Sequence, residues 1–101
     1  MFPVELKKVF DRAVKDSIEQ IQVIFLAFKE GELDLKSHID NKMDFYIGIV
    51  IATIFEKYAV YAAMTGKFTK QQIMSPNPLI AYNIFQMIPT LKEKIKEQVG
   101  L

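Results

Sequence analysis

The stretch IDNKMDFYIGIVIATIFEKYAVYAAMTG, residues 39–66, decides the fold of this chain. Its apolar side chains recur at helical spacing, and no part of it alternates with the period of two that is typical of a strand. The spacing predicts one long helix from about Ile39 to Thr65. Gly66 follows directly and is a typical stop, because glycine accepts the left-handed conformation that ends many helices. We therefore expect this stretch to form the central helix.

The residues before this stretch predict another long helix. Pro3 suits a first helical turn, Glu5 favours the positive end of a helix, and Gly31 is a candidate stop. The opposite side of this segment is charged, as is typical of a solvated face. Its apolar side chains recur at helical spacing and form one stripe: Leu6, Phe10, Val14, Ile21, Ile24, Phe25 and Phe28.

The last part of the chain predicts a third long helix. We expect Asn77 to cap it, with Pro78 at its first position and Gly100 at its end. Pro89 lies inside the apolar stripe and removes one backbone donor, so we expect a kink near Phe85–Gln86. The stripe consists of Ile80, Ile84, Ile88, Leu91, Ile95 and Val99.

These elements predict an all-α fold. Thr69 with Gln72 three residues later is a capping-box pattern, which indicates a short connecting helix between the central and last helices. A chain of 101 residues and 11.7 kDa leaves little room for a second core. We therefore expect a single α-helical domain over residues 1–101, a small bundle of three long helices and one short one that forms an oligomer.

The distribution of charge suggests that part of this bundle is covered. Residues 1–44 carry sixteen charged side chains, whereas residues 45–91 carry four: Glu56, Lys57, Lys67 and Lys70. A monomer of this size buries only about two thirds of the surface of its unfolded chain, so much of its helix surface stays wet. A nearly charge-free middle half therefore predicts a second covering, such as another copy, another protein or a membrane.

At 100° per residue, the central helix has two apolar faces. One is a broad stripe of large side chains: Met43, Ile47, Val50, Ile51, Ile54, Tyr58 and Tyr61. Beside it lies a stripe of small residues interrupted by one aromatic: Gly48, Ala52, Phe55, Ala59, Ala62 and Ala63. The narrow polar side is expected to consist of Lys42, Tyr46, Thr53 and Lys57. Because the large stripe can pack on the other two helices, the small stripe is left for a further contact.

We expect this further contact to be an interface between subunits. Small residues let another helix backbone approach closely. The alternative is that the small stripe packs on a bulky neighbour within one monomer, such as Phe25 or Phe85. The candidate interface has five residues from the central helix and two from the last one: Gly48, Ala52, Phe55, Ala59, Ala63, Tyr82 and Phe85.

The acidic segment before the central helix contains the only histidine. Asp34 and His38 are four residues apart, a spacing at which a helix would turn both toward one cation. A stable zinc site usually needs three or four protein ligands, so we predict a solvated loop with no metal and no cofactor. Ser37 with Asp40 fits a capping pair for the helix that follows.

Residue types exclude several kinds of chemistry. The chain has no cysteine, its glycines are isolated, and Arg12 is its only arginine. Thiol catalysis, phosphate-binding loops and arginine clamps are therefore excluded. With a formal net charge of +1, the chain is not expected to bind nucleic acid. We predict no catalytic residues, and we expect Glu56 to lie at the edge of the polar side.

A transmembrane segment is not expected. The cleanest apolar run, Phe45–Phe55, has eleven residues and is followed by Glu56 and Lys57. A span needs about twenty apolar residues. The start, MFPVELKK, has no basic-then-apolar signal pattern, so we expect a cytoplasmic protein.

The sequence thus predicts a non-enzymatic protein that acts through protein–protein contact. Its partners are expected to be itself, as a homodimer or higher oligomer, and another protein for which it serves as subunit, adaptor or inhibitor. Two alternatives stay open. One is a ligand-binding or enzymatic bundle with a pocket between helices, and the other is a peripheral membrane-associated protein.

Overall fold

The computed structural model describes residues 3–30 and 41–99, and this part of the chain is helical with no strand. Its elements are α1 (Val4–Glu30), α3 (Lys42–Met64), α4 (Lys70–Met74) and α5 (Asn77–Val99). The predicted all-α fold of three long helices and one short connecting helix is therefore confirmed. The predicted Asp34–His38 pair, the Ser37–Asp40 pair and the two terminal stops, Gly31 and Gly100, lie outside the described residues.

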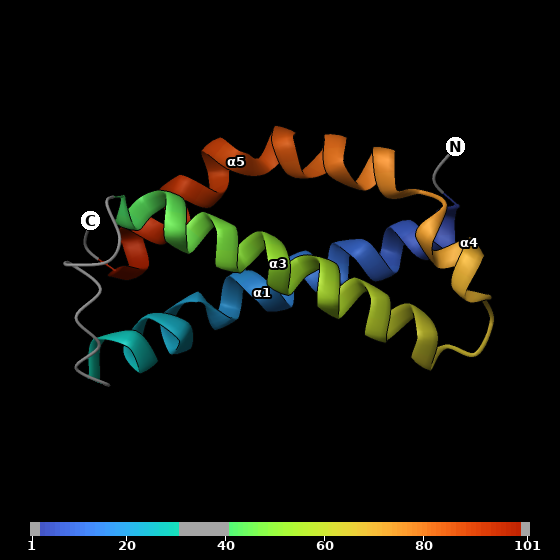
Figure 1. Cartoon of the computed structure of the whole chain (residues 1–101), viewed down its shortest axis with the longest axis horizontal. Coiled ribbons are helices and arrows are strands. Elements are labelled where there is room, and N and C mark those ends of the chain that lie inside the picture. Colours follow the sequence, from blue (N-terminus) through green and yellow to red (C-terminus); the bar gives the residue numbers. More distant parts are fainter. Residues whose placement is uncertain (1–2, 31–40, 100–101) are drawn as a thin grey trace.

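Helix α3 is the centre of the arrangement. It contacts α1, α4 and α5, and α1 and α5 also contact each other. In Figure 1, α3 passes in front of α1, while α5 lies along the upper edge and then bends down toward the first turns of α3. The molecule is elongated, at 43 × 24 × 21 Å. Its radius of gyration is 14.9 Å, whereas a compact domain of this length has about 13 Å.

The predicted stripes supply the core. Leu6, Phe10 and Ile21 of α1 are buried, as are Ile80, Ile84, Leu91 and Ile95 of α5. From α3 the core takes Ile47, Val50, Ile54 and Tyr58 of the large stripe, and also Tyr46 and Ala62. Tyr46 was expected on the polar side of the helix, and this prediction is wrong, since only 5% of it is exposed. A tyrosine ring is largely apolar and can pack in a core, so Tyr46 does not belong to the polar side of the helix.

The two ends of α3 show why it begins and ends where it does. It starts at Lys42, later than the expected Ile39, because Asn41 is the cap: its backbone is extended and its side chain accepts a hydrogen bond from the Asp44 amide at 3.1 Å. It ends before Gly66, which has a φ of +66°. The predicted stop is confirmed, because only glycine adopts this conformation without strain.

Helices α4 and α5 largely follow the sequence prediction. The capping box of α4 is present, with Thr69 and Gln72 bonded reciprocally. Pro89 lies inside α5, which continues through it as predicted. The predicted cap of α5 is wrong by one position: Asn77 is the first helical residue, and the amide of Ile80 donates to the carbonyl of Pro76 at 2.9 Å. A helix boundary read from a sequence is commonly wrong by this amount.

Candidate functional site

The candidate site is the side of α3 that faces away from the bundle, which we call the α3 outer face. It consists of five exposed residues, Gly48, Ala52, Glu56, Val60 and Ala63, and four half-buried ones, Phe45, Ile49, Phe55 and Ala59. Two of the half-buried residues, Phe45 and Phe55, also pack against the core of the bundle. These nine residues lie on one side of the helix because they recur at intervals of three and four. Only Glu56 among them is charged, so the face is apolar along nearly its whole length.

The structure brings five of the seven predicted interface residues together. Gly48, Ala52 and Ala63 are exposed, and Phe55 and Ala59 are half-buried, all on the α3 outer face. A Cβ atom added to Gly48 would meet no atom within 4 Å. Packing inside the monomer therefore gives no reason for a glycine at this position, where it costs a helix about 1 kcal/mol relative to alanine.

The other two predicted interface residues lie on a different helix. Tyr82 and Phe85 belong to the outward side of α5, where they are 62% and 69% exposed. Phe85 therefore does not fill the small stripe from within the monomer, and that alternative is wrong for this residue. The side chain of Phe25, the other proposed filler, lies outside what the structure describes.

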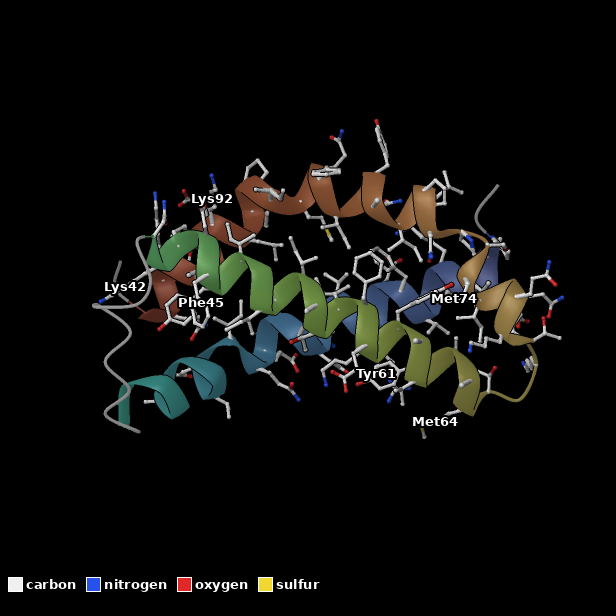
Figure 2. All side chains as sticks on the ribbon, in the orientation of Figure 1. Lys42, Phe45, Tyr61, Met64, Met74 and Lys92 are labelled. Atoms are coloured by element: carbon white, nitrogen blue, oxygen red, sulfur yellow. The ribbon has the colours of Figure 1, made fainter. Side chains whose placement is uncertain are left out.

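A groove that the sequence did not predict lies where α4 folds back on α3. Its volume is about 360 Å³, and it is lined by Ala59, Ala63, Phe68, Lys70, Ile73 and Met74. Figure 2 shows Met74 on α4 beside the C-terminal half of α3, with Phe45 at the opposite end of α3. Five of the six lining residues are apolar, so the groove is apolar like the α3 outer face. Its one charged lining residue is Lys70.

A buried hydrogen bond holds α4 in this position. The hydroxyl of Tyr58 donates to the backbone carbonyl of Ile73 at 2.7 Å, and both residues are nearly fully buried. Burial also raises the pKa of Tyr58 above its ordinary value. The side wall of the groove therefore depends on a contact between residues fifteen positions apart, which no local pattern in the sequence could reveal.

Tyr61 has a structural role at the contact between α1 and α3. The hydroxyl of Tyr61 donates to Asp16 Oδ2 at 2.7 Å, and the guanidinium carbon of Arg12 lies 4.8 Å from the centre of the Tyr61 ring. The hydrogen bond to Asp16 is the main cause of the raised pKa of Tyr61, followed by burial and the charge of Asp16, while Arg12 acts against it. The hydroxyl of Tyr61 therefore serves to join α3 to α1.

The structure gives no support to the other candidate sites considered from the sequence, a functional Glu56 carboxylate and a metal site, within the described residues. Glu56, expected at the edge of the polar side of α3, is exposed and lies among the apolar residues of the α3 outer face. Among residues 3–30 and 41–99, no group of three or more histidine and carboxylate side chains is placed to hold a metal ion. The groove beside Lys70 is therefore the feature of the described chain that sequence reasoning missed.

We predict that Tyr58→Phe lowers the free energy of unfolding by about 1–2 kcal/mol, because it leaves the buried carbonyl of Ile73 without its donor. Urea denaturation at neutral pH measures this loss, with Tyr82→Phe on the exposed side of α5 as the control that changes little. The raised pKa of Tyr58 means that folding favours the neutral phenol. Its contribution is complete below about pH 10, the unfolded value, and is lost as the pH rises through the folded pKa. Equal stabilities of the two variants would contradict this role.

One helix of the described chain is long and apolar enough to cross a membrane by length and composition: α3, of which 28% of the most apolar 18-residue window is buried. The core helix of a soluble protein passes the same test. Comparison of the chain with protein-family models, with curated proteins and with solved structures gives no match.

Proposed function

We propose that this chain is a non-enzymatic helical bundle that works through protein–protein contact, with a second copy of itself on the α3 outer face. The observation behind the proposal is the apolar character of the α3 outer face, where five of the nine residues are exposed and only Glu56 is charged. Apolar surface of this extent is unfavourable in water, and soluble proteins that display it use it for contact.

The α3 outer face is a continuous apolar surface with a single charged residue, Glu56. In a standard protein interface each partner contributes roughly 800 Å². A second copy is the simplest source of such a surface, because two-fold dimers are the commonest oligomers and use one patch on both subunits.

The proposal predicts that thermal stability depends on protein concentration. A dimer that forms only from folded chains is stabilised by mass action, so its melting temperature rises as the concentration increases. Circular dichroism melts at about 1 and 100 µM should therefore differ by several degrees in Tm. A melting temperature that is the same at both concentrations would contradict self-association.

A membrane surface is the second candidate for the covering, because α3 meets the length and composition of a membrane span. The apolar outer face would then lie in the interface of a bilayer. Flotation with neutral and anionic vesicles tests this candidate. Binding to vesicles together with a concentration-independent melting temperature would replace the proposed dimer with membrane attachment.

A further inference from the structure

We infer that the groove between α3 and α4 binds a linear chain of methylene groups that ends in a carboxylate, the anion of a free fatty acid, with the carboxylate at Lys70. This inference goes beyond the proposed self-association and does not depend on it. It follows from the space in the groove, from the chemistry of its lining and from the position of its one charge.

The groove has room for a small molecule. Its volume of about 360 Å³ lies within the range of roughly 300–1,000 Å³ that is typical of ligand pockets. On the α3 side the lining consists of Ala59 and Ala63, whose short side chains leave this space open. Six lining residues are too few for a protein partner alone, because each side of a standard interface has about 20–30 residues. The size of the groove therefore favours a small molecule.

The lining of the groove is apolar except at one point. Five of its residues carry no side-chain group that forms strong hydrogen bonds: Ala59, Ala63, Phe68, Ile73 and Met74. The backbone carbonyl of Ile73 already accepts a hydrogen bond from the hydroxyl of Tyr58 at 2.7 Å. Sugars and nucleosides would leave their own polar groups without partners against such walls, which is unfavourable. The body of the ligand is therefore expected to be apolar.

Lys70 supplies the one charge of the lining, and this charge is available to a ligand. Lys70 is exposed and forms no ion pair with a carboxylate of residues 3–30 and 41–99, whereas Lys67 lies 3.8 Å from Glu5. Glu56, the acid of the α3 outer face, does not line the groove. An ammonium group attracts an anion, and a hydrogen bond between two charged groups is stronger than one between neutral groups. The polar end of the ligand is therefore expected to be anionic.

The charge lies at one end of the groove. Lys70, Ile73 and Met74 are spaced by three and four residues, so they share one face of α4, with Lys70 at its start and the two apolar residues at its end. The bond from Tyr58 to Ile73 holds this apolar end beside the turn of α3 that contains Ala59, and Figure 2 shows Met74 on the same side. A ligand with its carboxylate at Lys70 would therefore extend its methylene groups toward Ala59.

Titration calorimetry with octanoate, decanoate and dodecanoate, below the concentrations at which they form micelles, tests the apolar part of the site. One fully buried methylene group increases the affinity about fourfold. Because a groove covers only part of a bound chain, each added pair of methylene groups should increase the affinity about three- to tenfold. Dodecyltrimethylammonium has a positive head and should bind about tenfold more weakly than dodecanoate.

Two pairs of variants locate the ligand. Ala63→Leu fills the groove and should weaken decanoate binding by about tenfold or more. Ala52→Leu is its control and should not weaken it, because both alanines belong to the α3 outer face but only Ala63 lines the groove. Lys70→Gln should weaken the binding of decanoate about fivefold and leave that of decanol unchanged. Lys92→Gln is its control, an exposed residue of α5 at the opposite end of the molecule from Met74 (Figure 2).

Circular dichroism verifies that every variant keeps its helix content. An affinity that rises with chain length, falls in Ala63→Leu and falls for decanoate alone in Lys70→Gln would support the inference. The absence of both a calorimetric signal and a rise in melting temperature with dodecanoate would overturn it. Undiminished binding to Ala63→Leu would place the ligand outside the groove, and undiminished binding to Lys70→Gln would remove the carboxylate from Lys70. Either result would contradict the inferred site.

Two further measurements separate this inference from its neighbours. Flotation with anionic phospholipid vesicles tests the membrane: vesicle binding that needs Lys70, without binding of free decanoate, would replace the free fatty acid with a lipid surface and overturn the inference. Light scattering tests self-association independently. A monomer that binds decanoate in the groove would overturn the proposed dimer and leave the ligand site standing, and a dimer that binds no carboxylate would do the reverse.

Discussion

Ala62→Glu is expected to unfold the chain, whereas Ala52→Glu is expected to leave it folded and to separate the two copies. Both alanines belong to α3, but Ala62 is fully buried within one copy and Ala52 is exposed on the outer face. An unpaired charge buried in a core costs several kcal/mol, which is a large part of the total stability of about 5–15 kcal/mol typical of a domain. At Ala52 the charge stays in water until a second copy covers it.

Two measurements on the same samples distinguish these outcomes. Circular dichroism reports helix content, and light scattering reports mass. Ala62→Glu should lose helix content, while Ala52→Glu should keep it and show the mass of one chain. A folded Ala62→Glu variant would contradict the described core, and a folded, dimeric Ala52→Glu variant would remove Ala52 from the interface.

Ile54→Ala should lower the free energy of unfolding by about 2–5 kcal/mol, because it removes a fully buried side chain and leaves a cavity at the centre of the bundle. Val23→Ala on α1 is the control, since Val23 is 65% exposed and its truncation should cost less than about 0.5 kcal/mol. Urea denaturation of both variants at one protein concentration measures the difference. A loss below about 1 kcal/mol at Ile54 would mean that the centre of α3 is not packed as described.

Much of the fold could be predicted because its information is local. The apolar stripes of α1 and α5 recur at a regular helical spacing, and the Thr69–Gln72 capping box lies within four residues. Pro89 was also correctly placed inside a helix, because the stripe continues on both sides of it. Patterns of this kind depend on one helix alone, so the sequence is sufficient to recognise them.

The wrong or missing predictions concern contacts between residues of different helices. Tyr46 is buried because neighbouring helices cover it, and its polar hydroxyl gave no sign of this. The groove beside Lys70 forms because Tyr58 binds the backbone of Ile73, a contact between separate helices. For the candidate interface the local pattern was more useful: Gly48, Ala52 and Ala63 are exposed, since the large stripe of α3 takes the core positions.

The mass of the purified chain in solution tests self-association most directly. Multi-angle light scattering at about 10–100 µM, within the range in which weak specific dimers form, should report close to twice the 11.7 kDa of one chain. A doubled mass would establish the self-association that the proposal requires. A mass of 11.7 kDa across this range, with no dye binding to apolar surface, would contradict the proposal. The chain would then be stable as a monomer without a partner on its apolar surface.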